Sequence, residues 1–303
     1  MSNKISLRKD IKKNLPLYLL VLPVIIYFIV FNYLPMTGVF MAFEDYSPVK
    51  GIFHSPLVGF KNFIRFFTAP NFFQILRNTL VISLLGLGIG FPLTIGFALI
   101  INEVTFLPFK KFVQAMSYIP YFVSMVIICG LIIDFVSSNG IITNLLVKLG
   151  FDRQNLLLNP KYFWVIYILS DLWQGLGYGS IVFVAAISGI NPELYEAAVI
   201  DGCGRWRRMW NITLPSIMPT IVTMFVLKCG MLMTVGFDKI LLLYNPSIYS
   251  TADVIATHVQ RMGLEKMQYG YSAAVGLFNS IVGTVLLIAS NILSKKITDH
   301  EVL

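Results

Sequence analysis

Six long runs of the sequence contain almost no charged residue. At about 1.5 Å of helical rise per residue, runs of this length can cross the roughly 30 Å hydrocarbon core of a bilayer. They cover residues 15–43, 78–102, 112–133, 162–190, 209–237 and 269–294. The chain is 56% hydrophobic and only 13% charged, with a mean hydropathy of +0.75, whereas soluble domains carry about 25% charged residues. We therefore predict an all-α polytopic membrane protein with six transmembrane helices.

Basic residues cluster in the short connections between these runs. The clusters are the N-terminal segment 1–14, Lys110-Lys111, the arginines at 205, 207 and 208, and Lys295-Lys296. Under the positive-inside rule, this pattern places both termini in the cytoplasm. The first run is too long for a signal-peptide core, so we expect it to be retained. The uncharged segment 240–252 is too short to cross and is expected to be ordered outside the membrane.

The residues that could bind a metal, catalyse a reaction or bind nucleic acid do not form the patterns typical of an enzyme or a nucleic-acid-binding protein. The three cysteines and three histidines are scattered, which predicts neither a metal site nor a disulfide framework. No G-x-x-x-x-G-K-[ST], H-E-x-x-H or G-x-S-x-G sequence occurs, so we expect no bound cofactor and no nucleotide on this chain. The basic residues are not spread along one face, as nucleic-acid binding requires. A membrane-embedded enzyme remains the disfavoured alternative.

A polar interruption separates the fourth and fifth apolar runs, at residues 191–215. Asn191 is a favoured N-cap residue, and Pro192 is favoured in the first turn of a helix. Together they predict a short helix over 192–200, which we expect to end at Gly202. A basic second segment then leads to Pro215, where the next run begins. The residues alone allow two interpretations, an ordinary interfacial loop or a rigid handle on the cytoplasmic surface that a partner moves.

The spacing within this interruption resembles the EAA motif of bacterial ABC importer permeases. The matching residues are Glu196, Ala197, Ala198, Gly202, Ile212, Leu214 and Pro215, while Cys203 replaces the usual alanine. Segments 15–18, 32–35, 60–63, 243–246 and 249–254 are similar to the carbohydrate-uptake, maltose-type branch of that family. Within this branch, the chain resembles the permeases for complex oligosaccharides and polysaccharide fragments, which are often from Gram-positive bacteria.

The resemblance implies an ABC type I importer transmembrane domain over residues 15–303, in the cytoplasmic membrane of a bacterium. It implies ATPase coupling through loop 191–215, with Glu196, Ala197, Ala198, Asp201 and Gly202 at the contact. The implied partners are a second homologous permease subunit forming a heterodimer, a dimer of ATPase subunits that binds Mg-ATP, an extracytoplasmic solute-binding lipoprotein and an oligosaccharide substrate. A permease of the same class for a non-sugar solute is the alternative.

Two charged residues inside the runs are candidates for the substrate path. Asp171 and Lys228 lie at similar depth, so they either pair with each other or each face a polar cavity. Asp171, Gly175 and Tyr178 share one helical face. The resemblance to maltose-type permeases implies that Tyr121, Gly175 and Tyr178 line the path. The full candidate set is Tyr121, Asp171, Trp173, Gln174, Gly175, Tyr178 and Lys228.

Two pairs of glycines have the small-xxx-small spacing that lets membrane helices approach closely. They are Gly86 with Gly90 in the second run and Gly175 with Gly179 in the fourth. We predict helix–helix packing at these positions, with an additional role on the substrate path only for Gly175.

Overall fold

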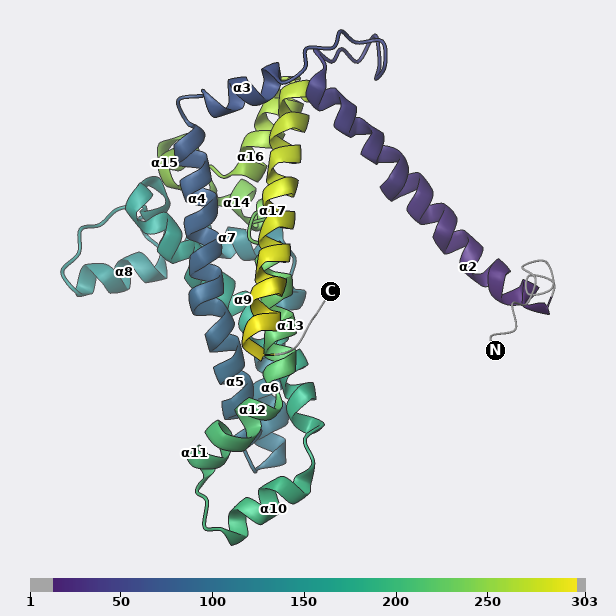
Figure 1. Cartoon of the computed structure of the whole chain (residues 1–303). Helices are drawn as coiled ribbons and strands as arrows, with labels where there is room; N and C mark the ends of the chain where they lie inside the picture. The colour runs from purple at the N-terminus through teal and green to yellow at the C-terminus, as the bar shows by residue number, and fades with distance from the viewer. Residues whose placement is uncertain (1–12, 299–303) are drawn as a thin grey trace. The chain divides into compact units, whose positions relative to one another are not determined.

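The computed structural model describes residues 13–298, which fall into two compact units. The first unit runs to Phe66 and includes Met262–Leu277, and the second comprises Phe67–Arg261 and the chain from Phe278 onward. Helices form all the regular elements of the described residues, apart from one isolated antiparallel bridge between Glu44 and Leu57 (Figure 1). Most of the basic N-terminal segment 1–14 lies outside the described residues, so its cytoplasmic placement stays a prediction.

The first unit contains a helix that buries none of its side chains. Helix α2 (Leu15–Phe28) continues through a π-helical turn at Ile29–Tyr33 and a 3₁₀ helix at Leu34–Phe43. A helix that is apolar all round is suited to a hydrocarbon environment, where its own backbone hydrogen bonds satisfy every amide. The first predicted run is thus helical along its whole length.

The second unit is a bundle arranged around one long helix, α9 (Pro160–Ser188), which packs against α5, α6 and α15. Its elements before α9 are α4 (Phe72–Leu85), α5 (Phe91–Glu103), α6 (Leu107–Phe122), α7 (Met125–Val136) and α8 (Ile141–Lys148), while α3 (Lys61–Phe67) belongs to the first unit except for its last residue. Those after it are α10 (Pro192–Ile200), α11 (Arg205–Arg208), α12 (Leu214–Ser216), α13 (Met218–Gly230), α14 (Phe237–Leu243), α15 (Tyr249–Ala252), α16 (Ile255–Gln260) and α17 (Tyr269–Thr298), which contributes to both units.

Four helical stretches of the described chain are long and apolar enough to cross a membrane. They are Leu15–Phe43, Phe72–Glu103, Met125–Lys148 and Tyr269–Lys296. Two bent pairs bring the number to six if each pair counts as one span. These are Pro160–Ser188 with Pro192–Ile200, bent by 72°, and Arg205–Ser216 with Met218–Gly230, bent by 61°. Length and composition therefore allow the predicted six spans.

Two of the predicted runs differ in detail from the helices that form. The third run, 112–133, is divided between α6 and α7 at Val123-Ser124. Pro120 precedes this break, and its ring removes one backbone N–H from the helical ladder. The fifth run, 209–237, is helical only as far as Gly230, after which the chain turns through Met231–Gly236 before α14.

Glycine does allow close helix packing, but the closest approach is not at the predicted pairs. A Cβ placed on Gly177 would lie only 2.2 Å from the carbonyl oxygen of Ser117 in α6. At Gly179 the nearest atom is Thr94 Cγ2 of α5, at 3.3 Å, whereas nothing lies within 4 Å of a Cβ on Gly86 or Gly175. Gly177 therefore sets the separation of α6 and α9.

The segment 240–252 is ordered, as predicted, and it forms part of the core of the second unit. Ile240, Ile248 and Ala252 are fully buried, and they pack in one cluster with Phe163 of α9 and Ile128 of α7. Burying this apolar surface stabilises the unit by about 25 cal/mol per Å². The segment 240–252 is therefore fixed to the bundle of the second unit.

Candidate functional site

Helix α10 begins as the sequence predicts. The side chain of Asn191 caps it, because its Oδ1 accepts a hydrogen bond of 3.1 Å from the Glu193 amide. Pro192 occupies the first turn, where a backbone N–H would have no partner within the helix, so the lack of one costs nothing. These two residues fix the point at which the chain leaves α9 and turns into α10 (Figure 1).

The end of α10 depends on Gly202. The Gly202 amide donates to the Val199 carbonyl at 3.0 Å, and the Cys203 amide donates to the Ala198 carbonyl at 2.8 Å. This pair of hydrogen bonds is a Schellman cap, in which one residue takes the left-handed conformation. Gly202 has φ +73°, a value that costs a residue with a side chain about 1–2 kcal/mol. The predicted end of the helix at Gly202 is confirmed.

The second half of loop 191–215 continues into the bundle. Helix α11 passes through a π-helical turn at Met209–Thr213 into α12. The Tyr195 hydroxyl in α10 lies 2.9 Å from the Thr213 hydroxyl, whose residue is only 1% exposed. This contact joins the two halves of the loop and was not identified from the sequence. We call residues Pro192–Ser216 the handle.

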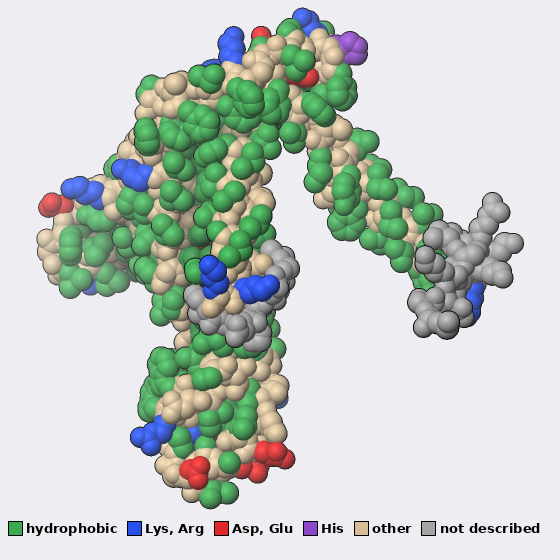
Figure 2. Space-filling view, in the orientation of Figure 1, with side chains coloured by type: hydrophobic (Ala, Val, Ile, Leu, Met, Phe, Trp, Pro, Cys, Tyr) green, Lys and Arg blue, Asp and Glu red, His purple; other side chains and the backbone are tan. Residues whose placement is uncertain are grey.

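One face of the handle is open. Glu196, Ala197, Asp201 and Gly202 are exposed, whereas Ala198 is 9% exposed and lies on the inner side. Large apolar residues are exposed beside them, with Ile200 at 85% and Trp206 at 70%. Acidic and basic side chains gather at this end of the second unit, next to apolar ones (Figure 2). Such a mixture on a short, capped helix is suited to contact with another protein.

The structure brings two candidate path residues into direct contact. The rings of Tyr121 in α6 and Tyr178 in α9 stack with centroids 3.8 Å apart and an interplanar angle of 4°. Both residues remain exposed, so the stacked pair is open to its surroundings. The space beside Gly175 is open, Gln174 is buried and Trp173 is exposed. No contact given by the structure joins Trp173 or Gln174 to the stacked pair.

Asp171 forms an ion pair, but its partner is Lys239 rather than Lys228. Lys239 Nζ lies 3.6 Å from Asp171 Oδ1 and 5.3 Å from the centre of the Tyr167 ring. The Lys239 side chain is 1% exposed, while that of Asp171 is 56% exposed. Lys228 is exposed on α13. The pairing of Asp171 with Lys228 is thus not the one that forms, and Lys239 was not identified from the sequence because it lies outside the apolar runs.

A second polar network joins α4 to the segment between α13 and α17. Asp253, which is 3% exposed, forms an ion pair with Arg261, whose guanidinium also lies 4.7 Å from the centre of the Tyr249 ring. Burial alone would lower the pKa of Arg261, but hydrogen bonds and charge from Asp253 outweigh it and raise that pKa. The buried Asn78 side chain donates to the carbonyl oxygens of Ser250 and Asp253, at 3.2 and 3.0 Å.

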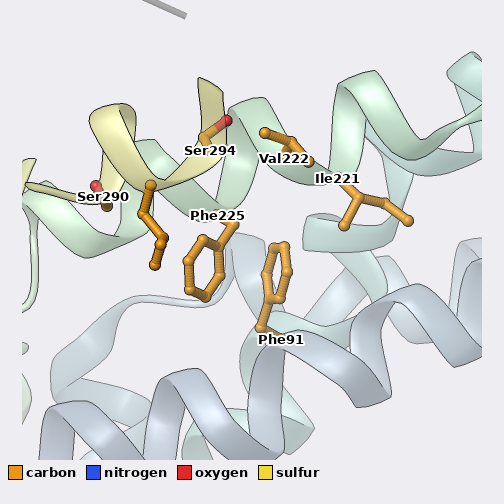
Figure 3. A pocket seen from close by; sticks show the side chains of 7 residues that line it. Phe91, Ile221, Val222, Phe225, Ser290 and Ser294 are labelled. Carbon is orange, nitrogen blue, oxygen red and sulfur yellow. The ribbon is translucent and has the colours of Figure 1, made fainter. Parts of the chain in front are cut away.

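A small apolar pocket of about 150 Å³ lies between α5, α13 and α17 (Figure 3). The rings of Phe91 and Phe225 face each other across it, with centroids 5.9 Å apart. Its only polar side chains are Ser290 and Ser294. A sugar needs polar partners for its hydroxyl groups, so this pocket does not suit the predicted oligosaccharide. Within residues 13–298, no group of three or more His, Cys, Asp or Glu residues could hold a metal ion.

The described helices thus form an apolar bundle that carries an exposed polar loop between α9 and α13. The sequence profile of the binding-protein-dependent transport system inner membrane component family matches residues 86–299, and the chain belongs to this family. It is thus a multi-pass permease component of an ABC transport system.

The chain is similar over nearly its whole length to two relatives from Bacillus subtilis (strain 168). It is 45% identical over 287 residues to the polygalacturonan/rhamnogalacturonan transport system permease protein YteP, covering 94% of this chain and 89% of the relative. It is 40% identical to protein LplB, covering 96% of this chain and 92% of the relative.

Solved structures agree with this assignment. The chain superimposes with a TM-score of 0.90 and 43% identity on a chain of a bacterial ABC transporter involved in the import of the acidic polysaccharide alginate. The match covers 97% of this chain and 100% of the solved one. A second structure of bacterial alginate ABC transporter, in complex with alginate pentasaccharide-bound periplasmic protein, gives the same TM-score and identity.

Proposed function

We propose that this chain is a permease subunit of an ATP-driven importer for oligosaccharide fragments of acidic polysaccharides. The observation that carries the proposal is similarity over nearly the full chain to a polygalacturonan/rhamnogalacturonan permease and to a chain of an alginate importer. Polygalacturonan and alginate both consist of sugars that carry carboxylate groups. The stacked Tyr121–Tyr178 pair supports a carbohydrate path, since aromatic rings pack against sugar C–H faces and hydroxyls bind sugar hydroxyls.

In this proposal, the handle couples the chain to its ATPase partner. The exposed residues Glu196, Ala197, Asp201 and Gly202 form the contact together with the exposed apolar residues of the handle, and Ala198, which was predicted with them, lies behind them on the inner side. When two ATPase subunits bind Mg-ATP and close, they move the handle, and α9 and α13 transmit this motion to the bundle. This chain binds no nucleotide itself. The bend between α9 and α10 lets a displacement of the handle tilt the long helix that carries Tyr178.

The proposed assembly contains a second homologous permease subunit, which completes the path as a heterodimer, and an extracytoplasmic solute-binding lipoprotein. The chain crosses the cytoplasmic membrane of a bacterium six times, with both termini inside, and a Gram-positive source fits the Bacillus relatives. In this topology, the handle faces the cytoplasm, and the segment between α13 and α17 lies toward the outside.

Identification of the ligand tests the proposed cargo. Mass spectrometry of the ligand that co-purifies with the partner binding protein should identify an oligosaccharide that contains uronate residues. The reconstituted transporter should then accumulate that oligosaccharide in proteoliposomes only when ATP and the binding protein are both supplied. A peptide or amino acid as the bound ligand would show that the cargo assignment is wrong, while ATP-dependent uptake of that ligand would leave the transporter class intact.

A further inference from the structure

Arg77 is an exposed arginine on α4 whose side chain is held by a buried network. Its Nη2 donates to the Ser250 carbonyl at 2.7 Å and to Asn78 Oδ1 at 3.0 Å, and its Nε donates to the same Oδ1 at 3.3 Å. Asn78 is 0% exposed and its own amide group is fixed by two carbonyls. The guanidinium therefore has a fixed orientation although the residue is exposed.

Trp164 holds the same guanidinium from α9. The Arg77 Cζ atom lies 5.6 Å from the centre of the Trp164 ring, and the indole N–H donates to the Thr251 carbonyl at 2.8 Å. Cation–π contact of this kind stabilises an arginine over an aromatic ring. Since α15 packs against both α4 and α9, the three elements form one support for the cation (Figure 1).

The charge of Arg77 is not balanced by a carboxylate. Its hydrogen-bond acceptors are an amide oxygen and a backbone carbonyl, both neutral, and the ion pairs Lys239–Asp171 and Arg261–Asp253 do not include it. The neighbouring Arg261 differs, because it pairs with Asp253. Both N–H groups of the Arg77 Nη1 atom make no hydrogen bond to the described residues. A fixed guanidinium with free donors is preorganised to bind a carboxylate.

We infer that Arg77, positioned by Asn78 and Trp164, is a subsite for the carboxylate of a uronate sugar at the outer end of the path. This inference rests on the proposed function for the acidic cargo and for the topology, which places the start of α4 toward the outside. The Arg77 guanidinium binds the sugar carboxylate through Nη1, and Trp164 offers an aromatic surface beside it. The subsite selects acidic over neutral oligosaccharides before they reach the stacked tyrosines.

The test compares an oligogalacturonate with its methyl ester, which has the same ring and lacks the charge. Import into proteoliposomes is measured for the unchanged protein, for Arg77→Gln and for the control Lys161→Gln, which removes an exposed cation near Trp164. Arg77→Gln should raise the KM for the oligogalacturonate about tenfold and leave the KM for the methyl ester unchanged. Lys161→Gln should change neither KM by more than about twofold. Arg77→Lys keeps the charge but replaces the planar guanidinium and its fixed donors with a flexible ammonium group. It should give an intermediate KM for the oligogalacturonate.

An equal effect of Arg77→Gln on both oligosaccharides would overturn the inference, since a merely structural link between α4 and α15 would behave in this way. An effect that disappears when anionic lipids are omitted would assign the guanidinium to a lipid headgroup and would also overturn it. Unchanged KM values in Arg77→Gln would also overturn the inference, but they would leave the proposed function in place. Failure of the unchanged transporter to import the oligogalacturonate would instead refute the acidic cargo, and the subsite with it.

Discussion

The hydroxyl of Tyr195 lies 2.9 Å from the hydroxyl of Thr213, and this contact joins the first helix of the handle to the turn that leads into α13. Thr213 is almost completely buried, so the bond is protected from water. Along the chain, α10 is connected to the second half of the handle through the turn at Asp201–Gly204. The bond therefore links the two halves of the handle directly, as the proposed coupling to the ATPase requires.

Removing the Tyr195 hydroxyl should loosen this connection. Tyr195→Phe keeps the ring and deletes one hydrogen bond, which costs about 1 kcal/mol. We expect an assembled transporter that hydrolyses ATP but imports about two- to fivefold less substrate per ATP. The ratio of import to hydrolysis in proteoliposomes measures this. Thr213→Val should have a similar effect, and the double variant should be no worse than either single one. Additive losses would contradict a direct coupling between the two hydroxyls.

A charged side chain at Gly202 should abolish transport. Gly202→Asp forces a residue with a side chain into the left-handed region and places a carboxylate on the open face of the handle. We expect poor assembly with the ATPase and no import. Gly202→Asn is the matched control, because asparagine tolerates this conformation and has nearly the same size without the charge. It should retain most of the assembly. Normal uptake by the aspartate variant would refute the docking role of this turn.

The approach of α6 to α9 should tolerate no side chain at Gly177. A methyl group there would collide with the backbone of Ser117, so Gly177→Ala should destabilise the bundle by about 1–3 kcal/mol. Gly175→Ala is the matched control on the same helix, since the space beside Gly175 is open. The thermal midpoint of the detergent-solubilised protein, followed by size-exclusion chromatography, should fall for the first variant only. Equal midpoints would contradict the packing described for Gly177.

Replacing only one partner of the Asp171–Lys239 ion pair should destabilise the protein more than replacing both partners. Asp171→Asn leaves a buried ammonium group without its carboxylate, which costs about 1–3 kcal/mol. Lys239→Met in the same chain should restore most of the lost stability. The charge-reversed pair Asp171→Lys with Lys239→Asp tests function as well. Restored assembly without restored import would show that the carboxylate contributes to the path in addition to bracing the helices.

The handle could be predicted because its signals are local. Asn191 and Pro192 start a helix and Gly202 ends it through backbone preferences that need no tertiary context. The stacked tyrosines could be proposed only through the resemblance, since nothing in the two separate runs shows that Tyr121 faces Tyr178. Lys239 could not have been found in this way. It lies beyond the fifth apolar run. The chain brings Lys239 back toward α9 because helix α13 ends at Gly230, and no pattern of charged residues in the sequence indicates that helix end.

Site-directed disulfide cross-linking can show whether an ATPase subunit binds the open face of the handle. Ile200, which is 85% exposed, is replaced by cysteine in a Cys203→Ala background, and single cysteines are placed at exposed positions of the partner ATPase. We expect a cross-link between the two subunits that blocks ATP-driven import and is reversed by a reductant. Absence of any cross-link from position 200 in an assembled, transporting complex would contradict the proposed binding.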